Sequence, residues 1–161
     1  MSEGDIEYTD YARVNIFEVE AEEDGERPEG YRRRRVRIGP LIGAEEMGMT
    51  IYELEKGEAV CPYHYEYGRE EWLLVLSGRP SLRDPDDEFE LEPGDVYLFT
   101  EGEEGAHKVT NHGDEVARIA MLSNKDEPVI IIYPDGGKVG LQPVGKYFRL
   151  ADDVDYFDGE T

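Results

Sequence analysis

Short alternating runs of apolar and polar residues, separated by turn signals, make up most of the middle of this chain. Residues 49–54 alternate in the manner of a half-buried strand, and from residue 59 onward similar runs recur at intervals of roughly 8 to 12 residues. Residues 128–133 (PVIIIY) form a further apolar run. Clusters of Gly, Pro, Asn and Asp separate the runs, and no long stretch has the period of an amphipathic helix. The pattern predicts an all-β fold, either a closed barrel or a jelly roll.

The two ends of the chain are patterned differently from the middle. Residues 13–19 (RVNIFEV) alternate weakly and are predicted to form one strand, and residues 20–30 are predicted to form a charged, exposed loop. Residues 138–161 contain many apolar and aromatic side chains. We therefore expect this last segment to pack on the barrel or on another subunit.

Residues 31–39 (YRRRRVRIG) concentrate the positive charge of the chain. In a strand, Arg33, Arg35 and Arg37 would share one face, and Arg32 and Arg34 would share the other face with the apolar residues that follow. Acidic residues are abundant enough to pair with both rows, which argues against a nucleic-acid patch. The alternatives that stay open are an arginine that reaches an anionic substrate and an arginine that reaches a partner subunit.

The charge balance narrows the possible partners. The chain has 161 residues and a net charge of −22, which disfavours binding to nucleic acid phosphates or anionic lipids. This acidity indicates a well-hydrated surface, or a source cell with high internal salt. No apolar run approaches the roughly 20 residues of a membrane span, and the polar N-terminus does not resemble a signal peptide, so a cytoplasmic location is expected. The single cysteine, Cys61, excludes an internal disulfide framework.

Two of the three histidines, His64 and His107, lie in strand-like segments, and the first of these segments also carries Glu66 and Glu71. Alternation places His64 and Glu66 on one face of a strand, with Tyr63, Tyr65 and Tyr67 on the other face. Glu71 follows a turn that allows the next strand to aim its side chains anew. Two imidazoles and two carboxylates form a plausible ligand set for one divalent metal.

Each of these residues taken alone is more often a packed or surface group than a ligand. The third histidine, His112, lies in an Asn-His-Gly-Asp turn and is expected to face solvent. Cys61 has the opposite strand parity to His64 and is expected to be a buried or half-buried thiol. The argument for a metal therefore rests on the combination of the four residues.

At these positions the sequence resembles the cupin superfamily. The first cupin motif is matched by Gly57, His64, Glu66, Glu71 and Gly78, and the second by Pro93-Gly94-Asp95, His107 and Asn111. The resemblance covers roughly residues 36–123, and the spacing to Gly78 favours Glu71 over Glu70. The chain departs from the family pattern at Glu66, which replaces a histidine, and His64 lies one residue later than the motif asks.

The resemblance implies a jelly-roll (double-stranded β-helix) cupin barrel in a single domain, residues 1–161. Its core would span about residues 36–123, with N- and C-terminal extensions over 1–35 and 124–161. It also implies one divalent metal ion (Zn, Ni, Mn or Fe) held by His64, Glu66, Glu71 and His107 at the mouth of the barrel. A metal-free cupin is the alternative.

One fold hosts many functions, so the chemistry is less constrained than the architecture. The first hypothesis is a metal-dependent enzyme, of the isomerase or dioxygenase type, that acts on a small oxygen-rich metabolite such as a sugar, a hydroxy acid or a keto acid. The second is a non-catalytic module that binds or senses a small ligand. A third is a purely structural metal in a closed site. A homodimer is expected, because the arginine-rich strand and the apolar C-terminal segment need partners beyond one small barrel.

Overall fold

The computed structural model of the protein describes residues 13–160, and β-strands dominate this part of the chain. The strands are β1 (Glu22–Glu23), β2 (Arg34–Arg37), β3 (Met47–Leu54), β4 (Tyr65–Tyr67), β5 (Glu71–Ser77), β6 (Ser81–Arg83), β7 (Glu88–Glu90), β8 (Val96–Phe99), β9 (Lys108–Thr110), β10 (Ala117–Asn124), β11 (Val129–Tyr133), β12 (Lys138–Gln142) and β13 (Lys146–Arg149). The helical segments are short: α1 (Ile38–Ile42) and the 3-10 turns η1 (Glu103–Gly105) and η2 (Leu150–Asp152).

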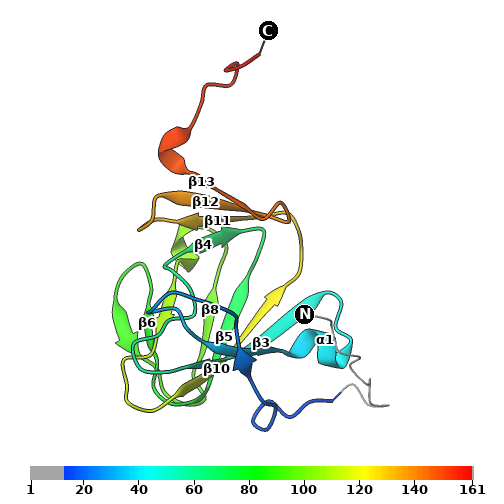
Figure 1. The fold of residues 1–161 in the computed structure, drawn as a ribbon, viewed down its shortest axis with the longest axis vertical. Helices are drawn as coiled ribbons and strands as arrows, with labels where there is room; N and C mark the ends of the chain where they lie inside the picture. The colour runs from blue at the N-terminus through cyan, green and yellow to red at the C-terminus, as the bar shows by residue number, and fades with distance from the viewer. Residues whose placement is uncertain (1–12, 161) are drawn as a thin grey trace.

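Three antiparallel sheets enclose the interior (Figure 1). The largest has the order β1-β2-β3-β10-β5-β8, the second β13-β12-β11-β4, and the third β7-β6-β9. Strand β10 lies at the centre of the largest sheet, where it pairs with β3 on one side and β5 on the other. Neighbours in the sheets are often far apart in sequence, as a jelly roll requires, and the predicted all-β jelly-roll barrel is confirmed.

The inward faces of these strands build an apolar core at one end of the barrel. Side chains on β5 alternate, so that Leu73 and Val75 are fully buried while Trp72 is half exposed on the other face. Ile119 of β10 lies opposite Val75 and belongs to the same cluster. The cluster consists of Leu54, Val60, Leu73, Val75, Leu82, Leu91, Phe99, Val109, Ala117 and Ile119.

Residues 13–19 form a turn and not the predicted strand. The Asn15 carbonyl accepts hydrogen bonds from the amides of Glu18 (3.1 Å) and Val19 (3.0 Å), and the Asn15 side chain caps the amide of Phe17 at 2.9 Å. An asparagine that bonds to the following backbone in this way offers an alternative to a strand ladder. The apolar residues of the segment, Val14, Ile16 and Val19, nonetheless pack against a second cluster around the buried Ile51.

The segment after residue 124 is part of the barrel as far as β13. Strand β11 pairs with β4, with Ile131 opposite Glu66, and β12 and β13 continue that sheet outward. Residues 150–160 extend away from the barrel (Figure 1), and Val154, Tyr156 and Phe157 are 70%, 90% and 76% exposed. The expectation that the C-terminal segment packs on the barrel is therefore right for 138–149 and wrong for 150–160, whose packing on another subunit stays a prediction.

Two residues of the cupin motifs, Gly78 and Asn111, have structural roles away from the histidines. Gly78 has a φ of +75°, and a Cβ there would lie 2.7 Å from the Cα of Ala117, so the close approach of two strands requires glycine. Asn111 is fully buried, and its amide group donates to the carbonyls of Leu54 (2.9 Å) and Glu115 (2.8 Å). Within residues 13–160, no helix is long and apolar enough to cross a membrane.

Candidate metal centre

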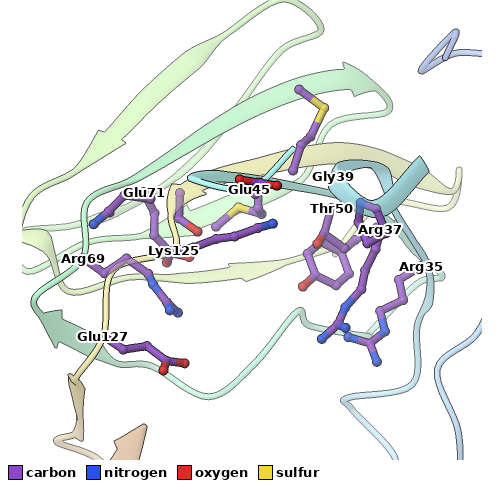
Figure 2. A pocket seen from close by; sticks show the side chains of 16 residues that line it. Arg35, Arg37, Gly39, Glu45, Thr50, Arg69, Glu71, Lys125 and Glu127 are labelled. Carbon is purple, nitrogen blue, oxygen red and sulfur yellow. The ribbon is translucent and has the colours of Figure 1, made fainter. Parts of the chain in front are cut away.

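Two adjoining cavities lie at the end of the barrel opposite the apolar core. The outer cavity has a volume of about 600 Å³ and is lined from β2, β3, β5 and β10 (Figure 2). The inner cavity, of about 230 Å³, holds His64, Glu66 and His107. Both cavities share four lining residues: Tyr52, Arg69, Glu71 and Met121. Glu71 therefore stands where the inner cavity meets the outer one.

A backbone bridge brings the two histidines together. The amide of His64 donates to the carbonyl of His107 (3.1 Å), and the amide of His107 donates to the carbonyl of His64 (2.9 Å). Residues that exchange two hydrogen bonds in an antiparallel pair project their side chains to the same side. The two imidazole rings accordingly lie side by side, with their centroids 4.6 Å apart.

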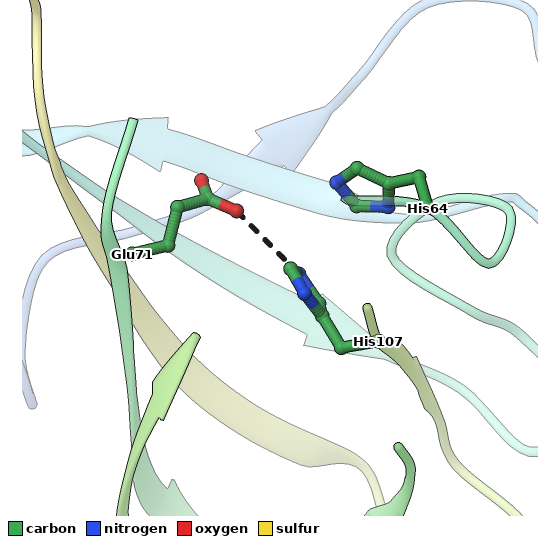
Figure 3. Close-up of side chains that lie close together, drawn as sticks. All are labelled: His64, Glu71 and His107. Atoms are coloured by element: carbon green, nitrogen blue, oxygen red, sulfur yellow. Dashed lines mark ion pairs between the residues drawn. The ribbon is translucent and has the colours of Figure 1, made fainter. Parts of the chain in front are cut away.

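Glu71 completes a three-residue group with these histidines (Figure 3). One ligand atom from each of His64, Glu71 and His107 lies within 4.8 Å of the others, and Glu71 Oε2 is 3.4 Å from His107 Nε2. Both histidines are buried, while Glu71 is partly exposed. Two imidazoles and one carboxylate on rigid strands are a donor set that divalent first-row metals accept.

The hydrogen bonds of the two imidazoles leave the nitrogens that face the cavity free to act as ligands. His64 Nδ1 lies 2.9 Å from the carbonyl of Pro62, and His107 Nδ1 lies 2.9 Å from the carbonyl of Gly105. A carbonyl oxygen only accepts, so each Nδ1 carries the proton and each Nε2 presents a lone pair. His107 Nε2 is buried without a hydrogen-bond partner, which fits a position meant for a cation.

Aromatic neighbours fix the orientation of both rings. Phe99 stacks on His107, with centroids 3.6 Å apart and an interplanar angle of 9°. Tyr133, at the end of β11, stacks on His64 at 5.8 Å and 29°. Side chains held by packing and by hydrogen bonds need little reorganisation on binding, so this arrangement favours a preorganised site.

The protonation states in the site suit a cation. Burial lowers the pKa of His107, which keeps its imidazole neutral. Burial on its own would raise the pKa of Glu71, but the contact with His107, with smaller contributions from His64 and Arg69, outweighs burial and holds this pKa below its usual value. A neutral histidine beside an ionised carboxylate is the state that metal binding requires.

Glu66, the fourth predicted ligand, lies beside the group but outside it. Its Oε1 is 3.8 Å from His64 Nε2, and its Oε2 is 3.6 Å from Arg69 Nη1 and has no hydrogen-bond partner. Burial, with the negative charge of Glu71, raises the pKa of Glu66 to about 7. Its role as a ligand stays a prediction, since only three of the four residues form the compact group.

The remaining sequence candidates lie where strand parity places them. Glu70 is exposed and accepts a hydrogen bond from Trp72 Nε1 at 3.1 Å, so the carboxylate that faces the cavity comes from Glu71. His112 is exposed and pairs with Glu88 at 3.0 Å, away from the other histidines. Cys61 is partly buried, with its Sγ 3.5 Å from His64 Nδ1, and burial raises the pKa of its thiol to about 12.

Sequence reasoning missed several residues of the inner cavity. Tyr133 was expected only as the end of an apolar strand, and Arg69 only as part of a turn, yet both line the inner cavity. Tyr52 also lines it, and burial raises the pKa of its hydroxyl. For Arg33 a signal existed, because the parity of the arginine-rich strand placed it in one row with Arg35 and Arg37. Tyr133 had no such signal, since its position depends on the pairing of β11 with β4.

Comparison with known proteins agrees with this architecture. The sequence model of the family described as "Cupin domain" matches residues 50–123. No curated protein matches the chain in sequence. A solved structure of a proposed sugar phosphate isomerase from Acidithiobacillus ferrooxidans is 23% identical and has a TM-score of 0.80, over 89% of this chain and 96% of that chain.

Two further structures share the fold. A sugar phosphate isomerase from a cupin superfamily, from Silicibacter pomeroyi, is 21% identical with a TM-score of 0.76, over 91% of this chain and 98% of that chain. The polyketide cyclase RemF from Streptomyces resistomycificus is 23% identical with a TM-score of 0.59, over 73% of this chain and 82% of that chain. The match over residues 50–123, together with the antiparallel barrel, identifies a cupin domain in this part of the chain, and these structures share its fold.

Proposed function

We propose that this protein is a metal-dependent enzyme that acts on a small oxygen-rich metabolite in the cavity above His64, Glu71 and His107. The observation that carries the proposal is the convergence of these three side chains, with both Nε2 atoms free, in a cavity that opens to a larger one. A divalent ion bound there would polarise a carbonyl or hydroxyl group of the substrate as a Lewis acid. Zn, Ni, Mn and Fe all accept such a donor set.

The chain's own residues supply groups for binding and for proton movement. Tyr52 and Tyr133 line the inner cavity, and burial raises the pKa of both hydroxyls, so they stay protonated and can donate hydrogen bonds to substrate oxygens. Glu66 has an oxygen without a partner and a pKa near neutrality, which suits a group that exchanges a proton with the substrate if it does not bind the metal. The presence of such a group supports an enzyme over a simple binding module.

Two structures with this fold carry the name sugar phosphate isomerase, and a sugar belongs to the substrate class that this cavity suits. Isomerisation of a sugar moves a proton between neighbouring carbons while an oxygen is polarised, and the site offers groups for both tasks. We therefore place aldose–ketose isomerisation first among the reactions to test.

Metal binding is the first test, with a matched pair of histidine variants. Metal-free parent protein should bind Mn²⁺, Ni²⁺ or Zn²⁺ in a calorimetric titration, and His107→Gln should weaken binding by at least about 100-fold. His112→Gln makes the same chemical change at an exposed histidine that pairs only with Glu88, and it should bind as the parent does. Protein that binds none of these ions would overturn the proposal.

Turnover is the second test. Metal-loaded protein should be incubated in D₂O with pentoses and hexoses, with and without a phosphate, and with hydroxy and keto acids, and followed by NMR. Deuterium incorporated next to a carbonyl, or a new isomer, would support an enzyme. Tight ligand binding without exchange or product would favour the non-catalytic binding or sensing module. A metal site that no ligand perturbs would favour a structural metal.

We also propose a homodimer, on different grounds from those the sequence suggested. Arg33, Arg35 and Arg37 line the two cavities, so we do not base the dimer on this row. By contrast, Trp72, Val96 and Leu98 are 50%, 59% and 45% exposed on the neighbouring strands β5 and β8, and β8 is an edge of the largest sheet. An exposed apolar edge favours association. Sedimentation at micromolar concentration should show a dimer in the parent and a monomer in Leu98→Glu.

A further inference from the structure

A row of three arginines runs along both cavities and has no part in metal binding. Arg33, Arg35 and Arg37 alternate along β2 and the residue before it, so their side chains share one face. Arg33 lines the inner cavity beside the histidines, and Arg35 and Arg37 line the outer one (Figure 2). The row therefore leads from the metal centre to the outer cavity.

Asp24 neutralises only part of this row. Its buried carboxylate is 2.7 Å from Arg33 Nε and 2.5 Å from Arg35 Nε, and it also pairs with Arg27 at 2.8 Å. Among the described residues, no carboxylate lies within ion-pair distance of Arg37, and its side chain makes no hydrogen bond. Three guanidinium groups share this one carboxylate, and of these only Arg35 lines the outer cavity, where the unpaired Arg37 lies in the same row.

Two more cations face the same space. Arg69 lines both cavities; its Nη1 is 3.6 Å from Glu66 Oε2, and its buried Nε has no hydrogen-bond partner among the described residues. Lys125 donates one hydrogen bond to the carbonyl of Ala44 (2.6 Å), which leaves other donors of its ammonium group free. In Figure 2, Lys125 extends between Arg69 on one side and the pair Arg35 and Arg37 on the other. Donors thus approach the cavity from different elements.

The acids of the outer cavity do not cancel these cations. Glu45 and Glu127 are exposed, and Glu71 belongs to the metal group. The lining carries four cations, Arg35, Arg37, Arg69 and Lys125, against these three acids, in a chain with 17 basic and 39 acidic residues. A local excess of basic groups in a strongly acidic protein indicates a site that selects an anion.

We propose that the outer cavity binds the phosphate group of a phosphorylated metabolite whose oxygen-rich part reaches the metal centre. The inference deepens the proposed function and rests on it for the identity of the reacting end. A phosphate oxygen cluster accepts hydrogen bonds from several directions, whereas one arginine fork satisfies a carboxylate. Arg35 and Arg37 would hold it from β2, and Lys125 would hold it from the segment after β10. The two adjoining cavities together are large enough for a sugar that reaches from the metal centre to the bound phosphate.

Inorganic phosphate binding to metal-free protein tests the site without the metal. With a chelator present, phosphate titration followed by calorimetry or ³¹P NMR should show saturable binding to the parent that weakens as salt rises. Arg37→Gln should weaken it about tenfold or more, because a charge-assisted hydrogen bond is lost. Arg37 is exposed and unpaired, so thermal melting should show that this variant is folded as the parent is.

Arg34→Gln is the matched control. It removes the same charge from the same strand, but Arg34 points to the other face and pairs with Glu53 at 3.0 Å. Phosphate affinity in this variant should stay within about twofold of the parent, because Arg34 lines neither cavity. Glu127→Gln should tighten binding about two- to threefold, because it removes a like charge from the cavity lining.

Any of three phosphate-binding results would overturn the proposal: no phosphate binding to the parent, unchanged affinity in Arg37→Gln, or equal loss in Arg34→Gln and Arg37→Gln. A change of oligomeric state in Arg37→Gln without loss of phosphate binding would identify the row as an interface and would also overturn it. The outcome of the metal titration is independent of the outcome of the phosphate titration. Phosphate binding without any metal binding would support the anion site and would contradict the proposed metal-dependent enzyme.

A separate experiment tests whether one ligand spans both cavities. In metal-loaded protein, ribose 5-phosphate should bind more tightly than ribose, and Arg37→Gln should reduce this advantage about tenfold or more, as it does for inorganic phosphate. Ribose itself should bind equally to the parent and to this variant. An equal loss for both sugars would show that Arg37 acts on folding or on the metal and not on the phosphate, which would contradict the proposal.

Discussion

The two ends of the barrel interior are built by the same strands and have opposite chemistry. Along β5 the inward row begins with Glu71 and continues with Leu73 and Val75. Along β10 the inward row runs from Ile119 in the core to Met121 at the shared boundary of the two cavities. One end is a closed apolar cluster, and the other is a cavity with buried histidines and carboxylates.

The residues of the apolar end stabilise the fold, whereas those of the polar end destabilise it. Buried apolar side chains gain free energy from leaving water, whereas the buried unpartnered atoms His107 Nε2 and Glu66 Oε2 are unfavourable without a partner. Such a polar end persists in folded proteins when it serves a function. Substitutions at the apolar end should therefore mainly lower stability, and substitutions at the polar end should mainly weaken ligand binding.

The largest effect on folding is expected at the apolar end. Leu73→Ala removes a fully buried side chain between β8 and β10 and should lower the free energy of unfolding by about 2–5 kcal/mol. Ile130→Ala, at an exposed isoleucine on β11 outside the proposed dimer surface, should change it by no more than about 1 kcal/mol. Urea unfolding of metal-free protein measures both, and equal effects would contradict the assignment of the core.

The largest effect on binding is expected at the polar end. Glu71→Gln removes the charged member of the three-residue group and should weaken metal binding by at least about 100-fold, with little loss of stability. Glu70→Gln, one position earlier and exposed, should bind metal as the parent does. If the Glu70 variant loses the metal and the Glu71 variant keeps it, the strand parity of the site is wrong.

Glu66 is expected to have a smaller effect on the metal because it lies outside the compact group. If it binds the ion, Glu66→Gln should weaken Mn²⁺ and Zn²⁺ binding by about tenfold or more, and Glu66→His should retain binding with a softer preference. Titration of the parent and both variants decides between the two roles. Unchanged affinity in Glu66→Gln would remove Glu66 from the ligand set and leave it as a candidate for proton transfer.

The smallest effect is a pH dependence of stability in the metal-free protein. Glu66 has a pKa of about 7 in the folded state and an ordinary value of 4.5, so between these values the folded state binds more protons than the unfolded state. Stability therefore falls as pH rises through this window. From about pH 5 to about pH 7.5 the parent should lose about 1–3 kcal/mol more than Glu66→Gln does. Parallel slopes in the two proteins would show that Glu66 titrates normally.

The sequence by itself determined the class of the fold and named the residues that meet at the candidate site. Strand alternation with a period of two is a local property, so it predicted β3, β5 and the shared face of His64 and Glu66 without knowledge of partners. The same parity grouped Arg33, Arg35 and Arg37. It failed at residues 13–19, where the Asn15 side chain bonds to the backbone and replaces a strand by a turn.

Only the tertiary structure decided which of these faces meet. The bridge between His64 and His107 joins two distant segments, and the pairing of β11 with β4 brings Tyr133 onto His64. That the arginine row lines a cavity likewise depends on the pairing of β2 with β3. Alternation fixes the relative orientation of neighbouring side chains, but the choice of strand partners depends on burying the whole apolar set at once, which no local pattern encodes.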